Sequence, residues 1–305
     1  MTAGPGRGPT GGATRHAIEH HYDVGRDFFR LWLGERMVYS CALWTGRIDD
    51  DLDAAQIAKL EWHASAAQVD GASRVLDVGS GWGAMLRYLI DERHVDHVTG
   101  LTLSSDQAAS GLSGDRAEVR LEDWRDHQPE RAYNAIISIG AFEHFARHDL
   151  ARAERRAIYT DFFERCARWL CQDGRLSLQT IAYEDFDPSS TPVSSFFTED
   201  IFPESGLPQL SDIIEAADPH FRLVGFRNDG AHYEHTLRLW QQRLQSNQVL
   251  ACQLAGRETY RRYLRYLRVS RAMFVRRLCT LYRMVLERRP TSAARASGFE
   301  VPSAP

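Results

Sequence analysis

The spacing of apolar residues along the chain changes character near residue 73. Before that point, apolar side chains recur at helical spacing over 16–33 and 52–68, with the aromatic stretch MVYSCALW between them. After it, short apolar runs alternate with helical segments as far as residue 181. Alternation of this kind predicts strand–helix–strand units and a parallel sheet.

Five strands are predicted in the alternating region: Arg74–Val78, His97–Thr102, Glu118–Leu121, Asn134–Ile139 and Arg175–Ile181. Helices are predicted over 84–91, 159–170 and most of 246–289. Two later runs, Phe221–Phe226 and His232–Leu239, are expected to form an antiparallel edge. The chain is therefore expected to adopt an α/β fold with a Rossmann-like, doubly wound, mostly parallel sheet.

Composition excludes several classes of protein. No run approaches 18 uncharged apolar residues, and the N-terminus has no apolar signal segment, so we expect a cytoplasmic protein without a membrane span. The five cysteines form no C-x-x-C pair, which argues against a disulfide framework and a zinc site. His20, His21 and His144 have no ligand partner at useful spacing, so no metal is expected.

Charge is unevenly distributed along the chain. The net charge of −4 gives no general case for nucleic-acid binding, and of 37 basic residues only Lys59 is a lysine. Residues 257–289 hold eleven arginines against two glutamates, a local charge of +9. This segment is either a solvated helix face or a docking surface for an anionic membrane or an acidic acyl carrier protein.

A glycine-rich motif, Asp77-Val-Gly79-Ser-Gly81-Trp-Gly83, follows a predicted strand and opens a predicted helix. Glycines allow close approach of a ligand to the backbone, and a helix N-terminus favours a negative group. The G-x-G-x-G spacing, and the lack of an acid at the next strand tip, disfavour a dinucleotide. The motif suits S-adenosylmethionine, and a tight turn without a ligand is the alternative.

Together with six further segments, this motif resembles the cyclopropane-fatty-acid synthase and mycolic acid cyclopropane synthase family of S-adenosylmethionine-dependent methyltransferases. The segments are HHYDVGRDFFRLWLGERMVYSCALW (20–44), VLDVGSGWG (75–83), GLTLSSDQ (100–107), IISIGAFEHF (136–145), YTDFFERCARWLCQDGRLSLQTI (159–181), EDIFPESGLPQLSDI (199–213) and HYEHTLRLW (232–240). The resemblance covers the chain from about residue 16 to 280.

The resemblance implies a single class I methyltransferase domain over residues 15–289, between flexible tails at 1–14 and 290–305. Its expected parts are a helical N-terminal cover (15–70), a cofactor-binding core (71–181), an inserted lid (182–212), and edge strands with C-terminal helices (213–289).

The resemblance also implies the residues that hold the cofactor. They are Tyr39, Ser40, Asp77, Gly79, Ser80, Gly81, Trp82 and Gly83 toward its methionine part, Thr102, Leu103 and Gln107 at its ribose, and Trp124 beside its adenine. Gln107 stands where the family usually has an acid and would supply a polar hydrogen-bonding group. For Trp124, a place in the plain hydrophobic core is the alternative.

Methyl addition to an alkene leaves a carbocation, which needs aromatic faces and a base that removes a proton. The resemblance implies a bicarbonate ion as that base, and the matching cradle is Cys41, Glu143, Gln179, the Ile181 backbone and Tyr233. Gln179 departs from the histidine of the mycolate synthases, and it cannot carry charge or relay a proton. Candidates for the aromatic wall are Tyr22, Tyr39, Trp44, Phe142 and Tyr233.

Some of these cradle residues have structural alternatives. Glu143 follows a buried strand, where a carboxylate is costly unless it is hydrogen-bonded or catalytic, and a purely structural carboxylate is the alternative. Cys41 could equally be a small buried hydrophobe.

Two further departures bear on the acceptor. The chain is about a dozen residues shorter than the mycolate synthases between Gln179 and residue 201, and it has an extra charged stretch at 148–156. We expect methyl transfer to an unsaturated carbon of a fatty acyl or lipid chain. A tailoring methyltransferase of a small secondary metabolite, acting at carbon, nitrogen or oxygen, is the alternative. A non-catalytic cofactor-binding protein is a third and weaker hypothesis.

Overall fold

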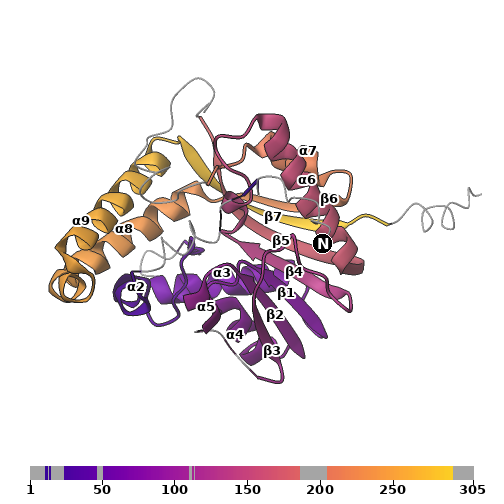
Figure 1. The fold of residues 1–305 in the computed structure, drawn as a ribbon, viewed down its shortest axis with the longest axis horizontal. Helices are drawn as coiled ribbons and strands as arrows, with labels where there is room; N and C mark the ends of the chain where they lie inside the picture. The colour runs from indigo at the N-terminus through magenta and orange to yellow at the C-terminus, as the bar shows by residue number, and fades with distance from the viewer. Residues whose placement is uncertain are drawn as a thin grey trace, which may run out of the picture.

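The centre of the molecule is a seven-stranded sheet with strand order β3-β2-β1-β4-β5-β7-β6 (Figure 1). This computed structural model describes residues 11–12, 14, 24–46, 51–109, 112, 114–185 and 205–290. The first five strands in the chain pair in parallel with one another, and helices cover the sheet. The expected Rossmann-like α/β fold is confirmed.

All five predicted parallel strands are present. They are β1 (Arg74–Val78), β2 (His97–Thr102), β3 (Ala117–Leu121), β4 (Tyr133–Ile139) and β5 (Leu170–Tyr183). The predicted bounds of β1 and β2 match, whereas β5 begins five residues earlier than expected. Strands β1 and β2 are buried almost throughout, which is typical of a parallel sheet covered on both faces.

The antiparallel edge was only half predicted. Strand β6 (Phe221–Asn228) is confirmed, but the strand expected over 232–239 is wrong, because those residues lie in helix α8 (Gly230–Ser246). The buried residues of α8 recur at helical spacing, which the short alternating window concealed: Tyr233, Thr236, Leu237, Trp240 and Leu244.

The missing strand is β7 (Cys279–Arg288), inserted between β5 and β6 and antiparallel to both. It lies in a region predicted to be mostly helical, so that prediction is wrong for its last part. Eight consecutive residues of β7 are buried, and a continuous buried run has no periodicity that separates strand from helix.

The helices flank this sheet. They are α2 (Arg26–Leu33), α3 (Leu52–Ala66), α4 (Ala84–Asp91), α5 (Ser105–Ala109), the short 3-10 helix η1 (Phe142–His144), α6 (Arg152–Trp169), α7 (Leu210–Ala217) and α9 (Gln248–Val275). Helix α6 begins seven residues before its predicted start, because the charged stretch over 148–156 supplies its first turns. Helix α9 is kinked at Gly256.

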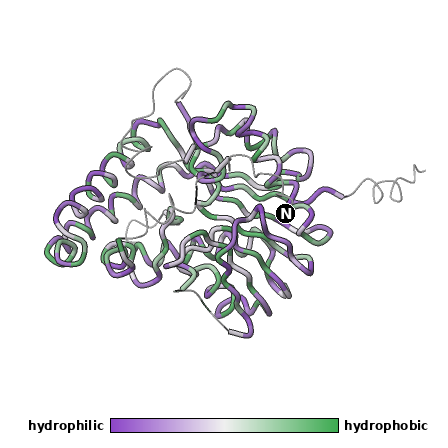
Figure 2. Tube along the Cα trace, viewed as in Figure 1, coloured by the Kyte–Doolittle hydropathy of each residue, from purple (hydrophilic) through white to green (hydrophobic). Residues whose placement is uncertain are grey.

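Three hydrophobic clusters hold these layers together. One lies between the sheet and α6 with α7, and another between the sheet and α3 with α4. The third joins α2, α8 and α9, which stand together beside the sheet (Figure 1). Figure 2 shows hydrophobic positions concentrated in the strands and hydrophilic ones recurring along α8 and α9. The third cluster encloses one side of the functional site.

Several expectations fall on other parts of the chain. Most residues of the two expected tails, the first part of the helix expected over 16–33, and residues 186–204 of the expected lid lie outside the described residues. None of the described helices is both long enough and apolar enough to cross a membrane.

Candidate functional site

A pocket opens at the carboxyl ends of β1 and β2, where open α/β sheets bind their ligands. Eleven of the twelve residues predicted to hold the cofactor line it: Tyr39, Ser40, Asp77, Gly79, Ser80, Gly81, Trp82, Thr102, Leu103, Gln107 and Trp124. The twelfth, Gly83, caps the N-terminus of α4 just behind this wall. One cavity therefore brings together residues from four separate segments of the chain.

The glycine loop is shaped by backbone conformation and close packing. Gly79 has φ 86°, and a Cβ there would lie 2.4 Å from the Cβ of Ala141. Gly81 has φ 54°, and a Cβ there would meet no atom within 4 Å, so its neighbourhood is open. The amides of Gly79 and Ser80 both donate to the carbonyl of Leu101, which ties the loop to β2.

The far end of the pocket suits a nucleoside. The Thr102 hydroxyl donates to Gln107 Oε1 over 2.7 Å, which fixes the amide at the ribose position. Trp124 packs edge-on against Phe162 with its ring centroid 5.4 Å away, so one side belongs to the core while the residue also lines the pocket. Both readings of Trp124, core residue and adenine neighbour, are therefore compatible with its position. Trp82 donates to Asp106 Oδ2 over 3.1 Å, which fixes the middle of the wall.

The near end of the pocket holds two opposite charges that are both buried, Asp77 and Lys59. Burial raises the pKa of Asp77 to about 7, and burial lowers the pKa of Lys59 to about 7. Lys59 donates to Ser40 Oγ over 2.9 Å, and Gln56 donates to the Ser40 carbonyl over 2.9 Å. Sequence reasoning missed Lys59, although its being the sole lysine was the available signal.

The arrangement of side chains along the pocket fits S-adenosylmethionine. The cofactor has a zwitterionic amino-acid end and a nucleoside end. The cavity has the buried Asp77 and Lys59 at one end, and at the other the Thr102 hydroxyl, the Gln107 amide and the Trp124 ring, with Glu122, Asp123 and Arg125 beside Trp124. Within the described chain, no side chain or amide donates a hydrogen bond to the Asp77 carboxylate. That acceptor is therefore available to an ammonium group.

Glu143 is the central residue of the predicted cradle. Its Oε1 accepts a hydrogen bond from the Ile181 amide over 2.7 Å, while its buried Oε2 has no hydrogen-bond partner among the described residues. Burial raises the pKa of Glu143 to about 7, even though hydrogen bonds act to lower it. A buried carboxyl group with one unpartnered oxygen can hold a ligand or exchange a proton near neutral pH. The Ile181 amide is committed to this carboxylate.

Cys41 and Tyr233 lie on the other side, in the third hydrophobic cluster together with Ile181. The Cys41 Sγ lies 3.9 Å from Thr236 Oγ1, and burial raises the thiol pKa to about 11. Burial also raises the pKa of Tyr233 well above its usual value, with the charges of Cys41 and Glu143 adding to the effect. Both groups are therefore neutral hydrogen-bond donors at neutral pH.

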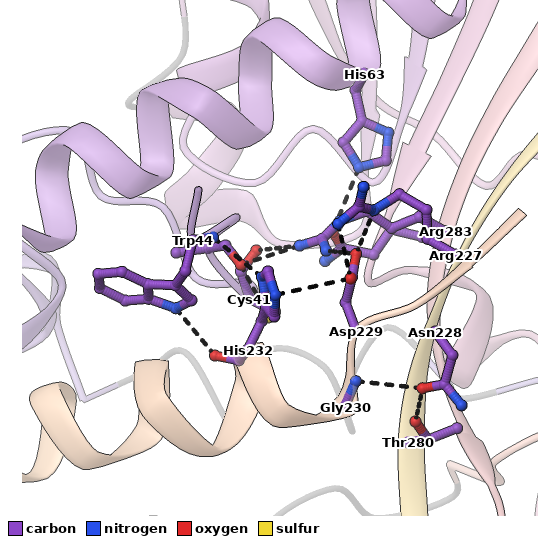
Figure 3. Close-up of polar contacts among 12 residues, drawn as sticks. Cys41, Trp44, His63, Arg227, Asn228, Asp229, Gly230, His232, Thr280 and Arg283 are labelled. Atoms are coloured by element: carbon purple, nitrogen blue, oxygen red, sulfur yellow. Dashed lines mark hydrogen bonds and ion pairs between the residues drawn. The ribbon is translucent and has the colours of Figure 1, made fainter. Parts of the chain in front are cut away.

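Gln179 belongs to a buried polar network. Arg283 Nε donates to Gln179 Oε1 over 2.9 Å, and His63 Nε2 lies 3.3 Å from the same oxygen. Arg283 is fully buried; it forms an ion pair with Asp229 and donates to the carbonyl of Cys41 over 3.2 Å. Figure 3 shows Arg283 between His63 and Asp229. Sequence analysis did not find His63, Asp229 or Arg283, because long-range pairing brings them together.

The expected aromatic wall is only partly assembled. Tyr39 packs within the third cluster, 5.2 Å from the ring of Trp32, and Tyr233 packs 4.7 Å from Phe274. Trp44 stacks on His235 at 4.1 Å and donates to the His232 carbonyl (Figure 3). Phe142 faces the opposite core, where it stacks on Tyr159 at 4.6 Å, so its expected place in the wall is wrong.

Four further residues singled out in the sequence remain: Tyr22, a candidate for the aromatic wall, and the three histidines His20, His21 and His144. Tyr22, His20 and His21 lie outside the described residues. His144 lines the cofactor pocket, and its Nδ1 lies 2.6 Å from Ser205 Oγ. Over the described ranges, no group of three or more His, Cys, Asp or Glu side chains could hold a metal ion.

The basic segment over 257–289 is not one surface. Arg283 is buried in β7 and serves the polar network, whereas the arginines of α9 include an exposed row at helical spacing: Arg257, Arg261, Arg265 and Arg268. The +9 charge counted along the sequence is therefore spread over the buried Arg283–Asp229 pair, ion pairs such as those of Arg271 with Glu234 and Arg289 with Asp218, and the exposed row on α9.

Comparison with known proteins gives consistent matches over most of the chain. The family described as mycolic acid cyclopropane synthetase matches residues 12–284. Cyclopropane mycolic acid synthase 2 of Mycobacterium tuberculosis is 34% identical over 276 residues, covering 85% of this chain and 89% of that protein. The solved structure of the cyclopropane synthase MmaA2 from Mycobacterium tuberculosis superposes with a TM-score of 0.80 at 30% identity, covering 90% of this chain and 99% of the other.

A second solved structure is informative about ligands. Mycolic acid cyclopropane synthase CmaA1, complexed with SAH and CTAB, superposes with a TM-score of 0.79 at 31% identity. The match covers 90% of this chain and 98% of that chain.

Proposed function

The chain belongs to the mycolic acid cyclopropane synthetase family and is an S-adenosylmethionine-dependent methyltransferase, and we propose that its acceptor is an unsaturated carbon of a fatty acyl or lipid chain. The outcome of such a transfer is either cyclopropanation or methyl branching. One observation carries the proposal: Glu143, beside the cofactor pocket, keeps a buried carboxylate oxygen that has no hydrogen-bond partner in the part of the chain that the structure describes.

When bound, S-adenosylmethionine supplies an electrophilic methyl group on a positively charged sulfur. Of this chain's own residues, the glycine loop around Gly79 and Gly81 would hold the cofactor close to the backbone. Gln107 and Trp124 would orient its nucleoside, and Asp77 would hold its amino group. Fixed orientation of the methyl group and exclusion of water are what the protein must contribute to the transfer.

On an alkene acceptor, the new carbon–carbon bond leaves a positive charge on the neighbouring carbon, and a base must then remove a proton. Glu143 is the proposed centre of that step. Because its pKa is about 7, it is present in both forms near neutral pH. Ionised, it can take the proton itself; protonated, it can donate to a bicarbonate ion that does so. Cys41 and Tyr233, both neutral, would add donors for that ion.

The positive charge also needs neighbours that do not react with it. Tyr233 and Tyr39 present aromatic rings in the cluster that borders this region, and cations are attracted to such faces. The Tyr233 ring is not ionised, since burial raises the pKa of Tyr233 well above its usual value. These rings support an acceptor that passes through a cation.

Gln179 favours a second candidate, a tailoring methyltransferase of a small metabolite. Its Oε1 already accepts from Arg283, and a glutamine cannot relay a proton. An acceptor that loses its proton without a bound anion would not need that relay. The two candidates differ in their dependence on bicarbonate.

The proposal includes a docking surface on α9 for an anionic membrane. Arg257, Arg261, Arg265 and Arg268 form an exposed row after the kink, and the exposed Val249 and Leu254 precede it. Basic side chains beside exposed apolar ones suit an anionic lipid surface. Co-sedimentation with phosphatidylglycerol vesicles, against phosphatidylcholine vesicles, tests this; binding of acyl carrier protein instead would contradict it. The five free cysteines support a cytoplasmic location.

The acceptor is tested by mass spectrometry of lipid extracts and small metabolites from cells with and without the gene. The proposal predicts acyl chains heavier by one carbon unit that disappear with the gene. Complementation with Gly81→Val, which should not bind cofactor, is the matched control. Loss of a methylated small metabolite, with unchanged lipids, would contradict the proposal and favour the second candidate.

A further inference from the structure

Lys59 is the only lysine in a chain with 36 arginines, and it lies under the cofactor pocket. It is 1% exposed, on α3, and its ammonium group donates to Ser40 Oγ over 2.9 Å. Elsewhere this chain uses arginine for every basic side chain. A buried, compact ammonium group at this position differs from the broad, always charged guanidinium in that it can gain and lose its proton.

The charges at this end of the pocket match the amino-acid end of the cofactor. Lys59 and Asp77 line the same cavity from α3 and β1, and no ion pair joins them within 4.0 Å in the described parts of the chain. An α-amino acid presents a carboxylate and an ammonium group side by side. We propose that Lys59, with the hydroxyl of Ser40, binds the carboxylate of the cofactor's methionine part while Asp77 binds its ammonium group.

The hydrogen bond to Ser40 supports this arrangement by its direction. An ammonium group only donates, so Ser40 Oγ is the acceptor in its bond with Lys59. The hydroxyl proton of Ser40 is then directed to another acceptor. Gln56 donates to the Ser40 carbonyl over 2.9 Å, which fixes the backbone of this residue at the pocket wall. Ser40 therefore presents a donor to the cavity beside a cation, as a carboxylate requires.

The protonation of this end should change when the cofactor binds. The charged or titratable groups facing Lys59 are Asp77, Arg283, Cys41 and His63; burial and the charge of Arg283 lower its pKa to about 7. A bound carboxylate favours the charged form and raises that pKa. A bound ammonium group lowers the pKa of Asp77, which burial holds at about 7. Binding should therefore take up a proton above pH 7 and release one below it.

The assignment rests on the cofactor of the proposed function and not on its acceptor, so a binding experiment separates the two. Calorimetry compares S-adenosylhomocysteine with 5′-methylthioadenosine, which lacks the amino-acid carboxylate and ammonium group. Lys59→Met should weaken the binding of S-adenosylhomocysteine about 10- to 100-fold, which is the scale of one charged hydrogen bond. It should leave the affinity for 5′-methylthioadenosine unchanged. Gln107→Ala is the control, since it should weaken the binding of both ligands by the same factor.

A second measurement needs no variant. Protein labelled with ¹³C- and ¹⁵N-lysine gives a single side-chain signal, because Lys59 is the only lysine. Its titration midpoint should rise by about one pH unit or more on addition of S-adenosylhomocysteine and stay unchanged with 5′-methylthioadenosine. An unmoved midpoint, or equal weakening of both ligands in Lys59→Met, would overturn the assignment. Neither result depends on which acceptor is methylated.

Discussion

Gln179 on β5 and Arg283 on β7 are register partners, and Arg283 Nε donates to Gln179 Oε1 over 2.9 Å. Because a guanidinium only donates, this contact fixes which end of the Gln179 amide is the oxygen. His63 Nε2 lies 3.3 Å from the same oxygen, so it must also be the donor, and burial keeps the His63 pKa well below its usual value. Because the Gln179 oxygen already accepts these two hydrogen bonds, the part of the side-chain amide that can contact a ligand is its nitrogen, as a donor.

This orientation makes a prediction about bicarbonate. Gln179 can donate to an anion but cannot share its charge or its proton, so we expect weaker dependence on bicarbonate than a synthase with histidine shows. Gln179→His should gain partial dependence. The assay is turnover in carbonate-stripped buffer with and without added bicarbonate, for parent and variant.

Strong bicarbonate dependence in the parent would contradict that expectation and would favour cyclopropanation of a lipid by a fully working cradle. Indifference in both proteins would favour the small-metabolite acceptor. Cofactor affinity, measured in the same buffers, is the control, because bicarbonate should leave it unchanged.

The Glu143 carboxylate is predicted to organise proton removal. Glu143→Gln keeps the shape of the side chain and removes the base, so turnover should fall by about 10²- to 10⁴-fold. Cofactor affinity should stay within a few fold, because Glu143 does not line the cofactor pocket. Equal turnover in the two proteins would make Glu143 a structural residue.

The same residue predicts a pH profile. Burial raises the Glu143 pKa to about 7, so the ionised form that accepts a proton becomes populated as the pH rises through that value. In carbonate-stripped buffer, where Glu143 itself must take the proton, the rate of the parent should therefore rise with pH across about 7. The rise should vanish in Glu143→Gln; a rise that persists there would have to come from another group.

Gly81→Val is predicted to abolish cofactor binding while the fold survives. Gly81 has φ 54°, which a β-branched residue rarely adopts, and its side chain would enter the open space of the pocket. Calorimetry with S-adenosylmethionine measures the loss, and circular dichroism checks the fold. Binding as tight as in the parent would show that the glycine loop is not the cofactor site.

Arg283 is predicted to be essential to stability. Its removal leaves Asp229 buried without its partner, so Arg283→Met should lower the free energy of unfolding by about 3–5 kcal/mol. Arg277, whose side chain is 67% exposed, is the matched control, and Arg277→Met should leave the free energy of unfolding nearly unchanged. Urea denaturation compares the two; equal effects would mean that the Arg283–Asp229 pair contributes little.

Local signals in the sequence were sufficient for the cofactor half of the fold. Strand β1, the glycine loop and α4 are adjacent in the chain, so the apolar run, the turn residues and the helical spacing all appear in one window. The residues from 39 to 124 that the resemblance assigned to the cofactor lie together, and all but Gly83 line one pocket, since matching motifs fix their order around the sheet.

The second half depends on pairing between distant residues, which local patterns do not encode. Strand β7 has an arginine at its centre, and the Asp229 and Gln179 side chains, together with the carbonyls of Cys41 and Ala42, make burial of Arg283 tolerable. In the same way, Lys59 was visible as an unusual residue, but its place under the pocket depends on how α3 packs against β1. The amino-acid sequence alone does not indicate how close Lys59 lies to the pocket.

The central claim, methyl transfer to an unsaturated carbon of an acyl chain, is tested most directly with S-adenosylmethionine that has a trideuterated methyl group. The purified protein is incubated with phospholipid that has cis-unsaturated chains, and the chains are then analysed by mass spectrometry. Cyclopropanation removes one deuteron from the transferred methyl group, so the product should retain two of its three deuterium atoms. A methyl branch beside a double bond, formed by loss of a proton from the acyl chain, retains all three. Labelled acyl chains of either kind support the claim, whereas no label in acyl chains under conditions where the protein binds the cofactor would contradict it.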